Sequence, residues 1–100
     1  MASNKLTKAE IVETLIEKTG FDKREIHLIV DTIFEEIRAA LSEDKIVELR
    51  GFGTFEIRTR KGRSKARNPK TGEPIQVYDH GVTIFRAGKE LKESARALRR

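Results

Sequence analysis

Two stretches in the first half of the chain repeat apolar residues at the spacing of one helix face. The first stretch starts at the capping sequence Thr7-Lys8-Ala9-Glu10 and stops at Gly20. In a capping box the threonine hydroxyl accepts from a backbone N–H three residues later, and glycine is the usual residue after a helix end. The apolar positions of this first helix are Ile11, Val12, Leu15 and Ile16.

The second stretch follows after only a few residues and has a broader apolar face. Its apolar positions are Ile26, Ile29, Val30, Ile33, Phe34, Ile37 and Leu41. Two helices joined by so short a connection form an antiparallel hairpin. The apolar face of the second helix is larger than the first helix alone can cover, so we expect further apolar surface to pack against it.

In the second half of the chain apolar and polar residues alternate, which is typical of strands. Runs at 46–50, 54–58 and 82–86 predict a three-stranded antiparallel sheet, and residues 89–98 predict a short last helix. A fourth run returns towards this sheet at 74–78.

The apolar residues of the fourth run and those of the strand that follows it would fall on opposite faces of one continuous strand. Ile75 and Val77 are at odd positions, whereas Val82 and Ile84 are at even positions. Since a shift of one residue reverses the faces of a strand, we expect a bulge near residues 79–81, with Gly81 in it.

From Arg58 to Lys70 the chain has seven basic residues and no acidic one. They are Arg58, Arg60, Lys61, Arg63, Lys65, Arg67 and Lys70. A segment of this composition cannot bury itself in a core, so it projects into solvent or lies against a polyanion. Asn68-Pro69 followed by Gly72 is typical of a turn, so we expect a basic β-ribbon with a proline at its tip. The basic run alone would also suit a flexible solvated loop.

Composition narrows the class of partner. One hundred residues hold at most one domain, and a net charge of +5 favours an anionic partner such as nucleic acid or an anionic membrane surface. The chain has no Cys, no metal-ligand spacing such as HExxH and no catalytic constellation around His27 or His80, so we expect neither an enzyme nor a cofactor. Without an apolar run of membrane-spanning length, we expect no membrane partner and a cytoplasmic location.

The order of these elements, together with two motifs, resembles the bacterial histone-like HU and integration host factor family. The motifs are Gly51-Phe52-Gly53-Thr54-Phe55 and Ala66-Arg67-Asn68-Pro69-Lys70-Thr71-Gly72. Three other segments are nearer to the integration host factor branch: Leu6–Glu10, Phe34–Arg38 and Phe85–Lys89. Ala66 and Ala87 depart from the usual pattern, so the branch stays open. The resemblance implies an α+β fold with a helical hairpin, a three-stranded antiparallel sheet with a long β-ribbon arm, a short C-terminal helix and an intertwined dimer.

The resemblance also implies one DNA-binding domain over residues 1–100, with a body at 5–57 and 79–98 and an arm at 58–78. In this family the arm enters the minor groove, where Pro69 would be inserted between base pairs, flanked by Arg67 and Asn68. The other implied DNA contacts are Arg58, Arg60, Lys61, Arg63, Lys65 and Lys70 of the arm and Lys5, Lys89 and Lys92 of the body. The implied dimer core includes Phe34, Phe52, Phe55 and Phe85.

The implied function is that of an architectural, nucleoid-associated protein that bends double-stranded DNA with weak to moderate sequence preference. The sequence leaves open whether the dimer is a homodimer or pairs with a paralogue, and whether binding is sequence-specific. An RNA-binding module and a dimeric protein-interaction scaffold are the alternatives.

Overall fold

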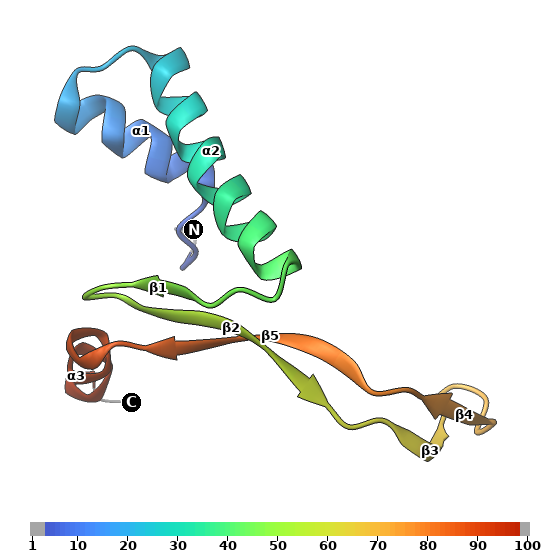
Figure 1. The fold of residues 1–100 in the computed structure, drawn as a ribbon. Helices are drawn as coiled ribbons and strands as arrows, with labels where there is room; N and C mark the ends of the chain where they lie inside the picture. The colour runs from blue at the N-terminus through green and yellow to red at the C-terminus, as the bar shows by residue number, and fades with distance from the viewer. Residues whose placement is uncertain (1–3, 99–100) are drawn as a thin grey trace. The chain divides into compact units, whose positions relative to one another are not determined.

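The computed structural model describes residues 4–98, apart from the side chains of residues 64–66. The described chain forms two compact units, which divide between Ala39 and Ala40. Most of the helical hairpin belongs to the first unit, and the strands and the last helix belong to the second (Figure 1).

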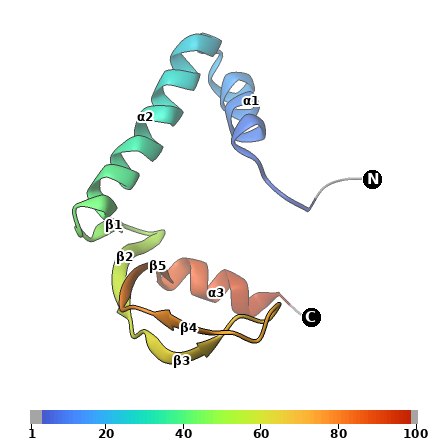
Figure 2. The same cartoon turned by 90° about the vertical axis from the view of Figure 1, so that its right-hand side faces the viewer.

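A short loop joins the two helices of the hairpin, α1 (Lys8–Thr19) and α2 (Lys23–Ser42) (Figure 2). The predicted ends of α1 are confirmed. Thr7 Oγ1 accepts from the Glu10 N–H at 3.2 Å, and Gly20 follows the helix with a φ of 71°. The local sequence therefore sets where α1 begins and where the chain turns into α2.

The core of the hairpin is small. Among the described residues, the buried hydrophobic side chains are Val12, Ile26 and Val30, which lie on the predicted apolar faces. α2 carries four more large apolar side chains, each at least 43% exposed: Ile29, Ile33 and Phe34 of the predicted apolar face, and Leu28 outside it. An apolar surface of this extent marks an interaction site, and α1 does not cover it.

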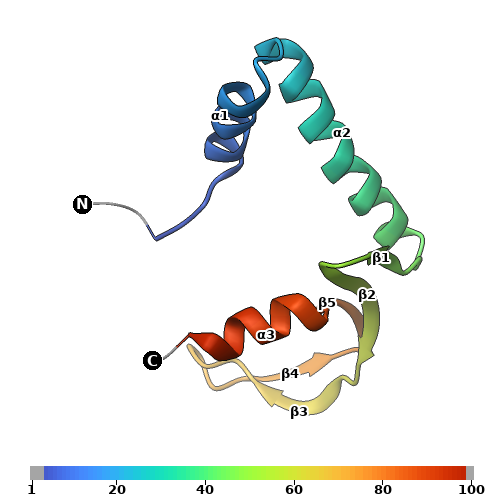
Figure 3. The ribbon, with the colours of Figure 1, turned by 90° about the vertical axis from the view of Figure 1, so that its left-hand side faces the viewer.

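The second unit holds a three-stranded antiparallel sheet in the order β1-β2-β5 and a two-stranded sheet, β3-β4. The bounds are Val47–Leu49 (β1), Gly53–Arg60 (β2), Arg63–Arg67 (β3), Pro74–Val77 (β4), His80–Ala87 (β5) and Lys89–Ala97 (α3). β3 and β4 form the arm, and α3 follows the other end of β5 (Figures 1 and 3). The predicted hairpin, sheet, arm and last helix are therefore confirmed.

The strand ladder breaks close to the position of the predicted bulge. Tyr78 and Asp79 lie between β4 and β5, outside both strands. Gly81, however, pairs regularly with Thr59 in the β2–β5 ladder, so its assignment to the break is wrong. β5 carries apolar side chains on both of its faces, Val82 and Ile84 on one and Phe85 on the other, so the odd and even apolar positions alone do not report a shift of register.

An extra residue lies instead in β3, on the opposite strand of the arm. Arg63 faces Val77 and Ala66 faces Ile75, so two residues of β3 lie opposite one residue of β4. This two-against-one arrangement is a β-bulge, which locally bends and twists a strand. The polar sequence of β3 has no apolar alternation that would reveal the shift of register.

Candidate nucleic-acid interface

The end of the arm is a hydrogen-bonded turn that exposes Pro69. The Asn68 side chain accepts from the Lys70 N–H at 2.9 Å, and the Gly72 N–H donates to the Asn68 carbonyl at 2.7 Å. Gly72 has a φ of 72°, a left-handed conformation that glycine adopts without strain. The predicted turn is thus confirmed, and it leaves the rigid, apolar ring of Pro69 exposed at the tip of the ribbon.

The two residues before Pro69 take part in the same turn. The Arg67 guanidinium donates to the Gly72 carbonyl at 3.1 Å, and the Asn68 N–H donates to the Glu73 carbonyl at 2.8 Å. A guanidinium has five N–H donors in a fixed plane, so this contact orients Arg67 and leaves further donors for an outside acceptor.

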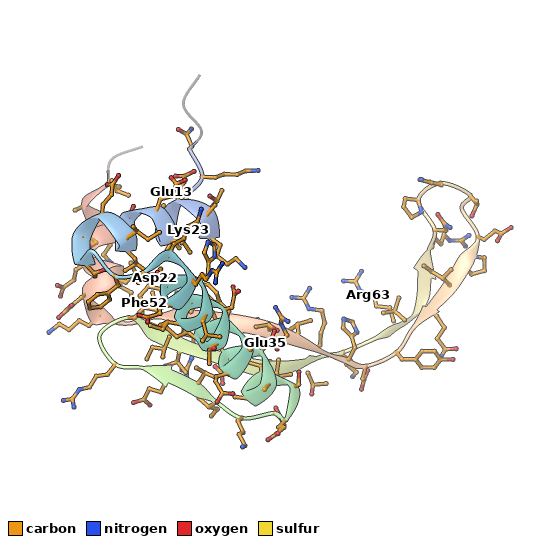
Figure 4. All side chains as sticks on the ribbon, turned by 90° about the horizontal axis from the view of Figure 1, so that it is seen from above. Glu13, Asp22, Lys23, Glu35, Phe52 and Arg63 are labelled. Carbon is orange, nitrogen blue, oxygen red and sulfur yellow. The ribbon has the colours of Figure 1, made fainter. Side chains whose placement is uncertain are left out.

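The basic side chains of the arm are exposed wherever the structure describes them. The predicted contacts in this group, besides Arg67, are Arg58, Arg60, Lys61, Arg63 and Lys70. The side chain of Lys65 lies outside the described residues. Figure 4 shows Arg63 on the arm, beyond the end of the three-stranded sheet. So dense a group of like charges produces a positive potential that attracts a polyanion.

A further charged group occupies one face of the three-stranded sheet. Glu56 Oε1 accepts a hydrogen bond from Arg58 at 3.1 Å and forms an ion pair with Arg86, whose Nε lies 2.8 Å away. The side chain of Glu56 is 15% exposed, whereas both arginine side chains are more than half exposed. Arg86 is missing from the predicted contacts, because only the register of β2 against β5 places it beside Glu56.

Neutralising Glu56 should strengthen the binding of an anionic ligand. In Glu56→Gln, Arg58 and Arg86 lose their shared carboxylate, and both become available for phosphates. We expect tighter binding to duplex DNA and a salt dependence steeper by about one to two units per subunit. The measurement is fluorescence anisotropy over a series of salt concentrations.

Glu48→Gln is the matched control for this variant. It makes the same charge change on the neighbouring strand β1, and the Glu48 carboxylate has no ion pair within the described part of the chain. An equal effect of both substitutions would show that net charge, and not the release of two arginines, changes the binding.

The opposite face of the sheet carries an aromatic cluster. Phe85 lies directly across from Phe55, with ring centroids 4.7 Å apart, and the Phe52 ring is 5.4 Å from that of Phe85. Phe52 is 49% exposed and Phe85 is 39% exposed, so the cluster is open to solvent (Phe52 is labelled in Figure 4). Three of the four predicted dimer-core residues thus meet in the second unit, while Phe34 lies on α2 and is 43% exposed.

The predicted basic residues of the body are all exposed. Lys89 and Lys92 lie in the first turns of α3, and Lys5 precedes α1 in the other unit. Lys89 and Lys92 are three residues apart, so they share one side of the helix. They can therefore contact neighbouring phosphates of one strand together.

An ion pair links the two helices of the hairpin. Lys8 Nζ lies 2.8 Å from Asp31 Oδ1, and this hydrogen bond holds the pKa of the Asp31 carboxyl below its usual range. A carboxyl with a lowered folded-state pKa contributes stability above its unfolded-state pKa, and this contribution is lost as the pH falls through the folded-state value.

We expect Lys8→Met to raise the pKa of Asp31, because the substitution removes both the hydrogen bond and the nearby positive charge. Carboxyl chemical shifts followed by NMR through an acid titration measure this pKa directly. Lys18→Met, at the other end of α1, should leave the pKa of Asp31 unchanged. The same pKa in Lys8→Met as in the unmodified protein would mean that the pair does not form in solution.

Neither a metal centre nor a membrane span is found between residues 4 and 98. In this described part, no three His, Cys, Asp or Glu side chains are grouped so that they could hold a metal ion. None of its helices combines the length and the apolar character needed to cross a bilayer.

Comparisons with known proteins match nearly the whole chain. Residues 6–96 match the family model described as bacterial DNA-binding protein. The integration host factor alpha subunit of Mannheimia haemolytica is 49% identical over 88 residues, 88% of either chain. That of Nitrosococcus oceani is 48% identical over 92 residues, 92% of either chain. The solved HU–DNA cocrystal structure from Anabaena has a TM-score of 0.83 and 35% identity, covering 93% of this chain and 100% of that one.

Proposed function

The chain belongs to the family of bacterial DNA-binding proteins that includes HU and integration host factor, and we propose that it binds duplex DNA and bends it. The observation that carries this proposal is the exposed Pro69 at the tip of a basic two-stranded arm. Such a protein acts as an architectural component of the nucleoid in the cytoplasm. The comparisons give no support to the alternative of an RNA-binding module.

The working unit is a dimer of a single DNA-binding domain, for which the sequence suggests a body at 5–57 and 79–98 and an arm at 58–78. Residues 58–60 pair with β5 in the three-stranded sheet, however, so they belong to the body, and β3 and β4 form the arm. Two features of the isolated chain support a second copy. Its buried hydrophobic core within the described residues is limited to Val12, Ile26 and Val30, and its aromatic cluster around Phe85 is open to solvent. A second copy that covers these surfaces adds apolar burial that one chain cannot supply.

Bending follows from the shape and chemistry of the arm tip. Pro69 is rigid and has no N–H, so it can enter the space between two base pairs without leaving an unpaired donor. Partial unstacking costs about a few kcal/mol per step, and the contacts made by the bent duplex offset it. HU and integration host factor are themselves standard examples of such binding, so its kinks of about 20–90° are a property of the class and not a result from this structure.

The charged residues hold the DNA but read little of its sequence. Arg67 and Asn68 lie beside Pro69 and can reach minor-groove acceptors, which distinguish A·T from G·C pairs only poorly. The other arm residues and Lys5, Lys89 and Lys92 contact phosphates or groove edges and release counterions. Sequence preference should therefore come mainly from the deformability of the DNA, and it should be weak to moderate.

A phosphate contact has a defined effect on salt dependence. We expect Lys89→Ala to weaken binding to all duplex sequences by a similar factor and to flatten the salt slope by about one unit per subunit. Anisotropy titrations on two unrelated duplexes, each at several salt concentrations, measure both quantities. An unchanged slope would remove Lys89 from the phosphate contacts.

Fluorescence resonance energy transfer between the ends of a short linear duplex tests the proposed function. Saturation with protein should bring the ends closer, and a duplex that stays straight when fully bound would contradict bending. Competition by double-stranded RNA of equal length, at the same salt, separates DNA binding from the RNA-binding alternative. Binding to DNA that hardly responds to salt would favour the protein-interaction scaffold instead.

A further inference from the structure

The arm is attached to the body sheet through an interruption of the strand ladder. Regular β2–β5 pairing ends with Arg60 opposite His80, and β3–β4 pairing starts with Arg63 opposite Val77. Residues 61–62 on one strand and 78–79 on the other belong to no strand. We call these four residues the arm joint.

The two strands come very close together at Gly62. A Cβ atom at this position would lie 1.9 Å from the Val77 carbonyl oxygen and 2.6 Å from the Tyr78 carbonyl carbon. Both contacts are with backbone atoms, which cannot move aside as the end of a flexible side chain can. Only glycine therefore fits here, and the reason is close approach of the other strand.

At Gly62 the hydrogen bond between the two strands is made by a side chain and not by a backbone carbonyl. The Gly62 N–H donates to Asp79 Oδ1 at 2.7 Å, in place of a carbonyl of the opposite strand. Hydrogen bonds to a carboxylate are shorter and stronger than those between neutral groups. The other end of the same segment is also fixed, because His80 Nδ1 lies 2.9 Å from the Tyr78 carbonyl oxygen. A carbonyl only accepts, so this contact is a hydrogen bond in the ring form that carries its proton on Nδ1.

We propose that Asp79 is a positioning residue, which sets the direction of the arm through its hydrogen bond to Gly62. This inference rests on the proposed DNA-bending function. A ribbon running from residue 63 to residue 69 is about 20 Å long at the rise of a strand. A rotation of about 10° at the arm joint therefore moves Pro69 by about 3–4 Å, roughly one base-pair step along a strand. The geometry of the arm joint thus sets where Pro69 reaches the DNA, and how often it lies where it can enter between two base pairs.

Two substitutions at one position separate the hydrogen bond from the charge. Asp79→Asn and Asp79→Ala remove the same negative charge, but only Asn keeps an oxygen that can accept from the Gly62 N–H. Any effect common to both variants is electrostatic, and any difference between them reports the hydrogen bond. Glu73→Gln, which neutralises the one acidic residue between Arg58 and Tyr78, is the charge control within the arm.

The first measurement needs no DNA. Hydrogen exchange of the Gly62 amide, followed by NMR, should be about tenfold faster in Asp79→Ala than in Asp79→Asn, as expected for the loss of one net hydrogen bond. The same Gly62 exchange rate in the two variants and the unmodified protein would overturn the proposal. Failure of the DNA-bending proposal would leave this result unaffected, so the two failures are distinguishable.

The second measurement is the distribution of end-to-end distances of single bound duplexes, observed by energy transfer. Asp79→Asn should bend DNA like the unmodified protein, whereas Asp79→Ala should give a broader distribution centred on a smaller bend. The two variants should share one affinity and one salt slope. Equal distributions in both variants would overturn the positioning role.

A purely structural role of Asp79 is tested by thermal unfolding. The arm joint lies outside the regular sheets, so both variants should unfold at the temperature of the unmodified protein. If Asp79→Ala unfolds at a lower temperature, the hydrogen bond is measured in the unmodified protein instead, as the scalar coupling between the Gly62 nitrogen and the Asp79 carboxyl carbon. A coupling supports the proposal, and its absence together with unprotected exchange of the Gly62 amide overturns it.

Discussion

The variant Pro69→Ala should still bind duplex DNA but should bend it far less than the unmodified protein. Alanine keeps the backbone of the tip turn accessible, since the Asn68 and Gly72 hydrogen bonds do not involve the proline ring. It removes the rigid apolar ring that fills the space between unstacked base pairs. We expect the bend angle to fall by about half or more and the affinity to fall by no more than about tenfold, since phosphate contacts dominate binding.

Ligase-mediated circularisation of duplexes of about 100 base pairs measures this bending, because DNA shorter than its persistence length rarely closes unaided. The chain supplies its own control in Pro74→Ala. Pro74 is the other proline of the chain, pairs with Arg67 at the start of β4 and is not at the tip of the turn. Circularisation by Pro69→Ala at the rate of the unmodified protein would contradict insertion of this residue.

The second large effect is expected from Phe85→Asp. The ring of Phe85 contacts both Phe52 and Phe55, and it is 39% exposed in the single chain. A charge in the centre of this cluster would be buried without a partner if a second copy packed there. We expect loss of the dimer, loss of cooperative unfolding and loss of DNA binding, because truncation of a buried phenylalanine alone costs about 3–5 kcal/mol.

Sedimentation and thermal unfolding measure this effect together. The unmodified protein should sediment as a dimer at micromolar concentration, and its unfolding temperature should rise with protein concentration. Phe85→Leu keeps the site apolar and should keep the dimer with reduced stability. A monomeric unmodified protein, or a stable dimer of Phe85→Asp, would contradict the packing of this cluster against a second copy.

Short-range signals allowed most of the fold to be predicted. The ends of α1 follow from Thr7 and Gly20, and the tip turn follows from Asn68, Pro69 and Gly72. In each case the hydrogen bond joins residues only a few positions apart. The residue types at those positions are therefore enough to predict the local geometry. The helix faces followed from apolar spacing for the same reason.

Features that depend on the alignment of two distant strands could not be predicted. Arg86 meets Glu56 only through the register of β2 against β5, and no local pattern fixes that register. The bond between Asp79 and Gly62 crosses seventeen positions of sequence. The sequence places a glycine and an acid there, but it does not show that the backbones approach too closely for a side chain. Such contacts appear only once the two strands are paired.

The bulge in β3 has a consequence for the way the arm fits its ligand. Residues that pair across a ladder point to one side, so Arg63 shares a side with Val77, whereas Arg67 shares the opposite side with Pro74. Without the extra residue, Arg63 and Arg67 would point the same way, because they are four positions apart. A ribbon inserted into a narrow groove has a wall of phosphates on either flank, and an arm that bound in this way would bring a guanidinium to each of them.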